Sequence, residues 1–320
     1  PRSRGLGDVY KRQGMVFMGT IALFSGQGSQ YEKMGLDLVQ QDAALEAIFE
    51  TASEVLGFDL YAVIADSNAQ TLAQTIYAQP AIMATSLVCL EAAKKHGFTY
   101  DAVAGHSLGE YAAMVAAGML SLEDGFRVIK ARAEAMDAAA KAADGAMCAI
   151  LKLAPAEVEQ ICAETEGYVV PANYNSSVQT VIAGDRDAVE KAAAACAAKK
   201  ARAVPLAVAS AFHTKLMQPA ADAFYAAIRN VTFAAPKVPF YSNVLGAVRT
   251  DFSDMPKALA EHIVSPVRFT DELAAMQAAG IDTFVEFGPK NVLTGLVKKT
   301  LKGVTAKNVE NCATLEGALA

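Results

Sequence analysis

The sequence predicts an α/β fold, in which helices cover a mainly parallel sheet and a smaller antiparallel unit is inserted into the layered domain. Two observations predict this class. Apolar strand-like segments alternate with helix-like segments along most of the chain, and the order changes to βαββαβ in the middle. A third observation marks a place for chemistry, because a serine stands between two glycines where a strand-like run passes into a helix-like run.

The alternating pattern begins near the N-terminus. Residues 16–24, VFMGTIALF, have the length and the β-branched and aromatic content of a buried strand. A helix is expected over residues 80–96, because Pro80 suits its first turn and Gly97 suits the position just past its end. Residues 102–104 then form a short strand.

Two further helices follow this second strand. The first starts at Leu108 and stops at Gly118. The second starts at Ser121, where Asp124 three residues later indicates a capping box, and it runs to about residue 141. Later in the chain KVPFYSNV and DTFVEFGP predict strands. Later helices are expected from Met217, Pro256, Phe269 and Asn291.

The middle of the chain has a different order of elements. Two helix-like segments, APAEVEQICAETEG and DRDAVEKAAAACAAKK, alternate with the strand-like segments GAMCAILKL, YVVPANY, VQTVIAG and ARAVPLAV. This βαββαβ order is the ferredoxin-like split unit. We therefore expect an inserted subdomain over residues 144–210, and a larger α/β domain made of residues 15–143 and 211–320.

Composition limits the classes of protein to which the chain can belong. Its 320 residues are 53% hydrophobic and 19% charged, which fits a globular protein large enough for two domains. A net charge of −6 gives no indication of nucleic-acid binding. We find no uninterrupted apolar run long enough for a bilayer, so no membrane is expected. Residues 1–14 lack apolar periodicity and are expected to be a leader or non-native segment.

The five cysteines are scattered, odd in number and without metal-ligand spacing. Free thiols are therefore expected, in a reducing cytoplasmic compartment, and no metal site is predicted. The cysteines are Cys89, Cys148, Cys162, Cys196 and Cys312.

The serine is Ser107 in GHSLG, which has the Gly-x-Ser-x-Gly pattern of a nucleophile elbow. The small flanking residues permit a sharp turn that lifts the hydroxyl above the sheet. The following helix offers unpaired N–H groups, so the Leu108 N–H is predicted to stabilise the oxyanion of a tetrahedral intermediate. The alternative is an ordinary helix N-cap at Ser107, but the strand before it and the helix after it favour a nucleophile.

A serine nucleophile needs a base, and the sequence has four histidines. His96 ends a helix beside two lysines, His106 neighbours the serine and points elsewhere, and His262 lies in a predicted helix without other features. His213 follows the apolar run AVPLAVASAF, where the chain leaves the insertion and can return to the sheet edge. We predict His213 as the base, and the alternative is a core or surface histidine.

No acid stands at a strand end between Ser107 and His213, because the Asp and Glu of that interval lie mostly on amphipathic helices. We therefore predict a Ser–His dyad whose imidazole is oriented by a backbone carbonyl. The glycine-rich SGQGSQ lacks the third glycine of a dinucleotide-binding loop. Gln27 in this loop offers an amide as the second oxyanion donor, and the alternative is a plain turn.

Arg132 lies on the apolar stripe that Phe126, Ile129, Ala133 and Met136 form on its helix. An arginine on a buried face needs an anion, because an unpaired buried charge is costly. An internal Asp or Glu could supply that anion, or the side chain could snorkel to the surface. We favour a bidentate clamp for a substrate carboxylate, with Met136 beside it in the substrate pocket.

These residues belong to segments that together resemble the malonyl-CoA:acyl carrier protein transacylases of fatty acid and polyketide synthesis. The matching segments are FSGQGSQ, GHSLGEYAA, RAEAM, GAMCAI, ANYNSSVQTVIAG, FHTKLM, SPVRF and EFGPKNVLTGL, which occur in the family's order. The resemblance implies a hydrolase-like α/β domain with a ferredoxin-like insertion. It also implies malonyl transfer from malonyl-CoA to the phosphopantetheine thiol of acyl carrier protein through a malonyl-serine, without a metal or redox cofactor.

The resemblance assigns roles to the residues already singled out. It makes Ser107 the nucleophile, His213 the base, Gln27 and the Leu108 N–H the oxyanion hole, and Arg132 the ligand of the malonyl carboxylate. The carbonyl that orients the histidine is expected at Arg268 in SPVRF. Phe212 resembles the residue of malonyl-selective members. Ser25 replaces a proline that the family usually has, so a looser loop is expected there.

Two other functions share some of these features. A serine esterase or thioesterase also has the elbow, and a non-catalytic module would only dock a carrier protein. Arg132 and a preference for a thiol over water as acceptor distinguish the transferase. Acyl carrier proteins are usually acidic, so docking on this acidic chain requires a local basic patch, and a merely solvated lysine cluster is the alternative. The expected patch consists of Lys199, Lys200, Arg202 and Lys215.

Overall fold

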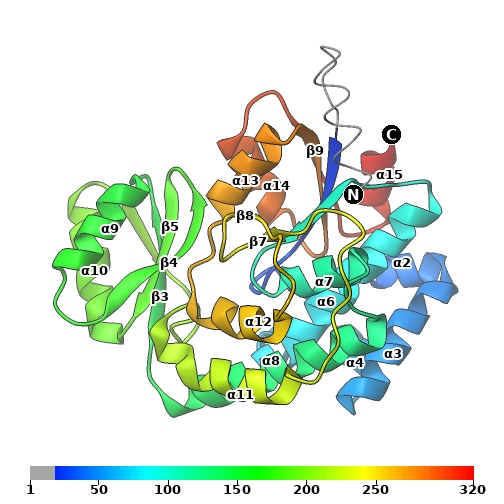
Figure 1. Cartoon of the computed structure of the whole chain (residues 1–320), viewed down its shortest axis with the longest axis horizontal. Coiled ribbons are helices and arrows are strands. Elements are labelled where there is room, and N and C mark those ends of the chain that lie inside the picture. The colour runs from blue at the N-terminus through cyan, green and yellow to red at the C-terminus, as the bar shows by residue number, and fades with distance from the viewer. Residues whose placement is uncertain (1–18) are drawn as a thin grey trace.

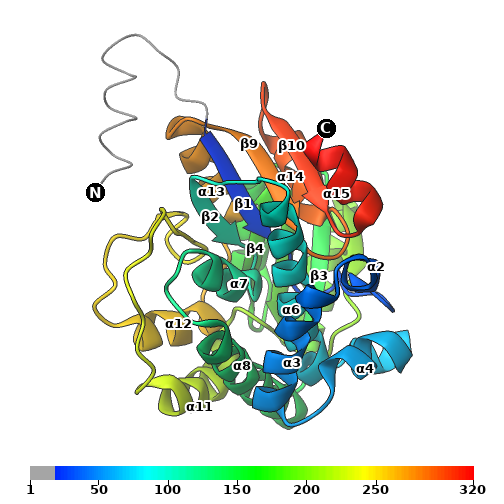
Figure 2. The same cartoon turned by 90° about the vertical axis from the view of Figure 1, so that its right-hand side faces the viewer.

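The computed structural model of the chain describes residues 19–320 (Figure 1). The predicted leader and the first residues of the predicted strand 16–24 lie outside the described residues. The centre is a four-stranded sheet with the order β10-β9-β1-β2, and every neighbouring pair is parallel. Figure 2 shows β1, β9 and β10 side by side. The strands are β1 (Gly19–Phe24), β2 (Ala102–Gly105), β9 (Ile281–Phe287) and β10 (Thr305–Val309).

Both faces of this sheet are buried, because successive residues of a strand point to opposite faces. Ala22 and Phe24 of β1 belong to the larger core, whereas Ile21 and Leu23 belong to the core on the other face. This explains why β1 is apolar without alternation. The helices of the larger core include α6 (Thr75–Lys95), α7 (Gly109–Ala116) and α8 (Leu122–Ala142), and those of the other face are α13 (Phe269–Ala278) and α14 (Val292–Thr300).

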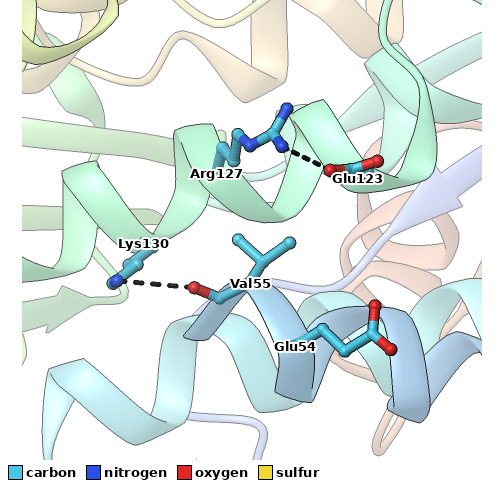
Figure 3. Close-up of a pocket in the computed structure, with 5 residues that line it drawn as sticks. All are labelled: Glu54, Val55, Glu123, Arg127 and Lys130. Atoms are coloured by element: carbon cyan, nitrogen blue, oxygen red, sulfur yellow. Dashed lines mark hydrogen bonds and ion pairs between the residues drawn. The ribbon is translucent and has the colours of Figure 1, made fainter. Parts of the chain in front are cut away.

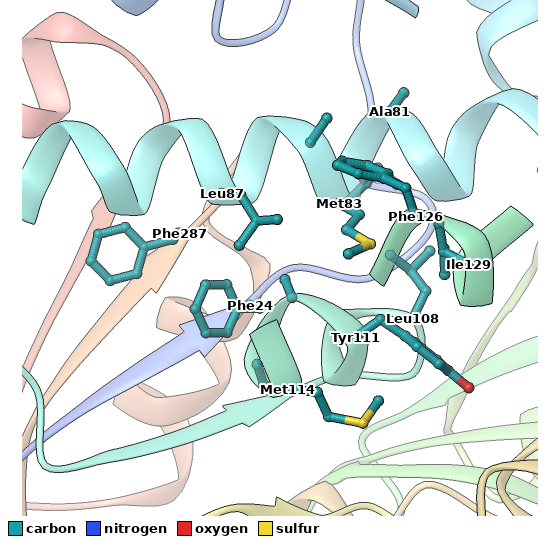
Figure 4. Packing of buried hydrophobic residues seen from close by; sticks show 14 of the residues in the cluster. Phe24, Ala81, Met83, Leu87, Leu108, Tyr111, Met114, Phe126, Ile129 and Phe287 are labelled. Carbon is teal, nitrogen blue, oxygen red and sulfur yellow. The ribbon is translucent and has the colours of Figure 1, made fainter. Parts of the chain in front are cut away.

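The larger core is filled by aromatic and methionine side chains from the sheet and from α6, α7 and α8 (Figure 4). Phe24 and Phe287 at the ends of β1 and β9 pack with ring centroids 6.0 Å apart. Leu108 at the start of α7 and Ile129 on α8 belong to the same cluster. The side chain that directly follows Ser107 in the Gly-x-Ser-x-Gly segment is therefore anchored in the core.

Helix α6 differs from its prediction in two ways. It begins at Thr75, and Pro80 lies inside it, because the buried polar side chains of Thr75 and Gln79 find partners in the protein. Within residues 19–320 it is also the one helix long and apolar enough on average to cross a membrane, although polar residues interrupt its apolar run as expected. Of its apolar window, 83% is buried in the protein, as for a core helix.

The remaining helices of the layered domain pack around α6, α8 and the sheet edge (Figures 1 and 2). The sequence analysis did not single out the first four of them or the last, which are short or amphipathic. They are α2 (Leu36–Gln41), α3 (Glu46–Leu56), α4 (Leu60–Asp66), α5 (Ala69–Leu72), α11 (Gln218–Ile228), α12 (Met255–Val264) and α15 (Cys312–Leu319).

The inserted unit has the predicted βαββαβ order, with an antiparallel sheet of order β4-β5-β3-β6. Figure 1 shows it as the green lobe beside the layered domain. It has its own core, which includes Ile150 and Ile182. The predicted borders at 143 and 210 stay predictions. Its elements are β3 (Ala146–Leu151), α9 (Pro155–Glu164), β4 (Val169–Ser176), β5 (Gln179–Gly184), α10 (Arg186–Ala198) and β6 (Arg202–Pro205).

The segment KVPFYSNV forms less strand than its composition predicts. Only β7 (Tyr241–Ser242) is a strand, and it pairs with β8 (Ala247–Val248) as a short hairpin. Phe240 adds one bridge to Val103 of β2. The strand ends there because the side chain of Asn243 forms the next contacts with β2. The central sheet therefore stops beside Ser107.

Candidate active site

Ser107 stands in the turn between β2 and α7, with a backbone φ of 56°. This left-handed conformation is strained for a residue with a side chain, as expected for a nucleophile elbow. The two glycines are required by close backbone approach. A Cβ on Gly105 would lie 2.0 Å from the Gly109 carbonyl carbon, and a Cβ on Gly109 would lie 2.2 Å from the Phe24 oxygen. The turn is thereby pressed against the end of β1.

His213 lies next to the serine, although 105 residues separate them in the chain. Its Nε2 is 2.8 Å from Ser107 Oγ, so the hydroxyl donates to the imidazole. His213 is 3% exposed and also has a left-handed backbone, with φ 62°. His96, by contrast, is exposed at the end of α6. The geometry brings the predicted nucleophile, Ser107, and the predicted base, His213, within hydrogen-bond distance of each other.

Two backbone carbonyls orient the imidazole. His213 Nδ1 lies 3.0 Å from the His262 oxygen and 3.1 Å from the Ser265 oxygen, both at the C-terminal end of α12. The prediction of Arg268 for this carbonyl is wrong. The Arg268 oxygen instead accepts the Glu272 N–H in the first turn of α13, while α12 ends at Val264, so carbonyls of its last turn and of its C-cap face the imidazole.

These contacts fix the tautomer of His213, and its burial determines its charge. A proton on Nδ1 is donated to the carbonyls, which leaves Nε2 free to accept from Ser107. Burial, reinforced by the nearby Arg132 charge, lowers the pKa of His213 to about 3. The imidazole is therefore neutral at physiological pH and able to take a proton.

Arg132 is buried beside the nucleophile. It is 1% exposed on the predicted apolar face of α8, between Ile129 and Met136, which are also buried. Its Nη1 donates to Gln79 Oε1 at 2.9 Å, and its Nη2 donates to Ser107 Oγ at 3.4 Å. Among the described residues no Asp or Glu forms an ion pair with it. An internal acid thus does not supply the anion that this cation needs.

Gln79 is a site residue that the sequence reasoning missed. It is fully buried on α6, its Nε2 donates to Thr75 Oγ1 at 2.8 Å, and its amide also contacts Met136 Sδ at 3.5 Å. The Thr75 hydroxyl in turn donates to Gln27 Oε1 at 3.3 Å. A buried chain of polar groups therefore connects Arg132 to the glycine-rich loop. The sequence did offer a signal for this site residue, namely polar residues in the otherwise apolar helix α6.

The glycine-rich loop lies against the elbow, because a Cβ on Gly26 would be 2.6 Å from the His106 oxygen. Gln27 and the N–H of Leu108 thus belong to adjoining segments. Ser25 does not loosen this loop as expected. It is 1% exposed, and its hydroxyl contacts Glu286 Oε2 at 3.1 Å and the Phe287 oxygen at 3.3 Å, which ties the end of β1 to β9.

The inserted unit also reaches the site. His106 Nε2 lies 2.8 Å from Asn175 Oδ1 on β4, so the residue before the nucleophile joins the two units. Phe212, next to His213, is half-buried and packs against both the larger core and a cluster of the insertion. The predicted carrier patch (Lys199, Lys200, Arg202 and Lys215) is exposed.

A hollow of about 380 Å³ lies between α3 and α8, away from Ser107 (Figure 3). It contains none of the predicted site residues. Arg127 there pairs with Glu123 and Asp124, and Lys130 donates to the Val55 oxygen. Both of its basic side chains therefore have partners within the protein. The His, Cys, Asp and Glu of residues 19–320 also form no group that could hold a metal ion.

Comparisons with known proteins agree with this geometry. The sequence matches the acyl transferase domain family over residues 22–318. It is 40% identical over 301 residues, 93% of this chain and 95% of the relative, to the malonyl CoA-acyl carrier protein transacylase of Bacillus subtilis strain 168. Its structure resembles that of the Clostridium perfringens malonyl CoA-acyl carrier protein transacylase, with a TM-score of 0.90, 34% identity and coverage of 94% and 96% of the two chains.

A further solved structure shows such a protein with its partner. It is a malonyl-transacylase in complex with a type II polyketide synthase acyl-carrier protein, with a TM-score of 0.90 and 35% identity. The match covers 94% of this chain and 99% of that one. With a family match over nearly the whole described structure and a dyad at its centre, the chain belongs to the acyl transferase family.

Proposed function

We propose that this protein transfers the malonyl group from malonyl-CoA to the phosphopantetheine thiol of acyl carrier protein, through a malonyl ester on Ser107. One observation carries the choice of acyl group. Arg132 is buried 3.4 Å from the nucleophile oxygen and has no acid partner among the described residues. An acyl group that ends in a carboxylate supplies that partner, and a neutral acyl group leaves a buried charge unpaired.

The first half-reaction acylates the serine. His213 Nε2 takes the Ser107 proton while Oγ attacks the thioester carbonyl carbon. The Leu108 N–H, at the start of α7, and Gln27, in the adjoining loop, stabilise the oxyanion. The tetrahedral intermediate collapses, the C–S bond breaks, and CoA leaves with the proton from His213.

The second half-reaction repeats these steps with another thiol. The phosphopantetheine thiol gives its proton to His213 Nε2 and attacks the ester carbonyl, and Ser107 recovers its proton as it leaves. In both steps the imidazolium forms against the C-terminal carbonyls of α12, whose partial negative charge stabilises it in place of an acid. The first step converts a thioester into an oxygen ester, and the second converts that ester back into a thioester. Neither step changes an oxidation state, so no redox cofactor takes part.

A hydrolase with the same elbow is the second candidate, and the acceptor distinguishes the two. The name of the Bacillus subtilis relative and the carrier complex of the solved neighbour support a carrier thiol as acceptor. The free thiols and this role both fit a protein of the cytoplasm.

The experiment is intact-protein mass spectrometry after mixing with malonyl-CoA alone. We expect a malonyl adduct on the wild-type protein and none on Ser107→Ala, which removes only the hydroxyl. Addition of phosphopantetheinylated carrier protein should discharge the adduct faster than water does by orders of magnitude. Discharge at the same rate with and without carrier would favour a hydrolase, and an adduct on Ser107→Ala would overturn the nucleophile.

A further inference from the structure

Asn243 has no role in the steps above, yet its side chain forms four hydrogen bonds behind the nucleophile. It is fully buried in the turn after β7. Oδ1 lies 2.8 Å from Ser107 N and 3.0 Å from His262 Nε2, and Nδ2 lies 2.7 Å from the Gly105 oxygen and 2.8 Å from Glu272 Oε2. The backbone N–H of Ser107 and the carbonyl of Gly105 fix this orientation of the amide.

The first pair of contacts holds the strained turn. Gly105 is the last residue of β2. On the side away from β1, the described residues pair with β2 only through the isolated bridge between Val103 and Phe240, so no strand backbone lies opposite Gly105 there. The Asn243 amide replaces that partner, because it accepts from Ser107 N and donates to the Gly105 oxygen. A left-handed serine persists only where its surroundings impose that backbone conformation.

The second set of contacts reaches the base. His262 Nε2 donates to Asn243 Oδ1, and the backbone oxygen of the same His262 accepts from His213 Nδ1. The backbone N–H of Asn243 also donates to Glu110 Oε1, at 2.7 Å. Glu110 lies in the first turn of α7, the helix that follows the nucleophile. One buried amide thus connects the segment that carries the serine to the helix end that orients the histidine.

We propose that Asn243 is a positioning residue, which holds the strained Ser107 backbone and the α12 terminus at the separation that makes the dyad. This inference rests on the proposed function, because it assumes that Ser107 and His213 react as described. It concerns the reactivity of the serine and not the binding of the acyl group. Its loss should therefore lower kcat and leave KM for malonyl-CoA nearly unchanged.

The test compares Asn243→Ala and Asn243→Asp with the wild type and with Asn311→Ala. Asn311 is the control, because its side chain also forms hydrogen bonds that are partly buried, in the capping box of α15, without contact to Ser107 or His213. Each protein is melted, assayed for kcat and KM with malonyl-CoA, and treated with a small fluorophosphonate. That reagent reports serine reactivity without malonyl recognition.

We expect Asn243→Ala to lower kcat and the fluorophosphonate rate together by at least about tenfold, with KM within twofold, whereas Asn311→Ala changes both rates by less than twofold. Asn243→Asp keeps the acceptor and loses the donor to the Gly105 oxygen. Burial raises the pKa of the adjoining Glu110 and Glu272 carboxyls, and it should raise the pKa of the new carboxyl between them in the same way. Protonation of that carboxyl restores the donor, so the rate of Asn243→Asp should rise from pH 8 to pH 6, opposite to any loss of the base.

Three results would overturn the proposal. They are unchanged fluorophosphonate labelling in Asn243→Ala, losses in Asn243→Ala and Asn311→Ala that follow only their melting temperatures, and no recovery of Asn243→Asp on acidification. If Asn243→Ala does not fold, the pH dependence of Asn243→Asp decides. A wild-type protein that the fluorophosphonate does not label would instead contradict the proposed function, so the two failures are distinguishable.

Discussion

At the scale of single residues, the site places a neutral base and a permanent cation around one hydroxyl. His213 touches Ser107 Oγ at 2.8 Å and Arg132 approaches the same oxygen at 3.4 Å. The cation disfavours a second positive charge on the imidazole, so Arg132 helps to keep the base unprotonated. Substrate binding and base strength are therefore coupled through the same guanidinium.

This coupling predicts an unusual pH dependence. Burial and the Arg132 charge lower the pKa of His213 to about 3, so the neutral form persists on the acidic side of its usual range near 6.5. We expect kcat/KM for malonyl-CoA to stay flat from pH 8 to pH 5 in steady-state assays. In Arg132→Ala, the acidic limb of the pH–rate profile should move to higher pH, because one of the two causes that lower the pKa of His213 is removed. A wild-type acidic limb with its midpoint between pH 6 and 7 would contradict this assignment.

The residues that the sequence revealed are those with a local signal. Ser107 stands in a short pattern, and Arg132 interrupts an apolar stripe on one helix. Gln79 has only the weak signal of a polar residue in an apolar helix, and Asn243 and His262 have none, because their roles arise only when distant segments meet. The error at Arg268 has the same origin, since a helix end decides which carbonyls remain unpaired, and its position depends on tertiary contacts.

At the scale of elements, the close contact between the end of β1 and the elbow positions the nucleophile. Gly105 and Gly109 let β1, β2 and α7 approach within contact distance of their backbones. The helix start then lies directly behind the reacting oxygen, where its unpaired N–H groups favour developing negative charge. The geometry depends on the absence of two methyl groups.

We therefore expect Gly105→Ala to destabilise the protein by about 3 kcal/mol or more, because the new Cβ would meet backbone atoms that cannot move aside as a side chain can. Its activity should fall more than its melting temperature accounts for. Gly295→Ala on α14 is the control. No atom lies within 4 Å of that Cβ, so the change should stabilise the helix by about 0.5–1 kcal/mol. Urea unfolding of both variants measures their free energies of unfolding. Equal stabilities of Gly105→Ala and Gly295→Ala would refute the close-contact explanation.

The element order was largely predictable, because β1, β2, α7, α8 and the inserted βαββαβ unit each have a clear period or capping residue. The failures have identifiable causes. β10, TAKNV, is a half-buried edge strand without apolar alternation, so nothing in its composition favoured a strand. KVPFYSNV is apolar enough for a strand, but Asn243 ends it after two residues. In both cases the neighbouring chain determines whether the segment forms a strand and how long the strand is. The sequence of one segment does not show which part of the chain will lie beside it.

At the scale of the whole molecule, the two units meet at the active site. Tyr174 N donates to the Val267 oxygen and Val267 N donates to the Ala172 oxygen, both at 2.8 Å, so β4 of the insertion adds to a segment of the layered domain. The Asn175–His106 contact lies beside this junction. The insertion is thereby held next to Ser107, where a carrier protein has to deliver its thiol.

The basic residues of the insertion are the proposed docking surface for the acidic carrier. We expect the double charge reversal Lys199→Glu and Lys200→Glu to raise KM for the carrier about tenfold and to leave KM for malonyl-CoA unchanged, because rim charges act mainly on encounter. The double reversal of Lys298 and Lys299 in the last turn of α14 makes the same change in net charge elsewhere. Equal effects of the two pairs, in transfer assays at low salt, would remove the surface from consideration.

The central claim is that the site is built around a carboxylate, and the ratio of kcat/KM for malonyl-CoA to that for acetyl-CoA tests it most directly. The wild type should prefer malonyl-CoA by a factor on the order of 10⁴, because acetyl leaves Arg132 buried and unpaired. In Arg132→Ala, malonyl transfer should fall about 10²–10³-fold while acetyl transfer holds or rises. Arg132→Lys should recover only part, since an ammonium lacks the two-bond fork. A parallel loss of both activities with a lowered melting temperature would contradict the claim and make Arg132 a structural residue.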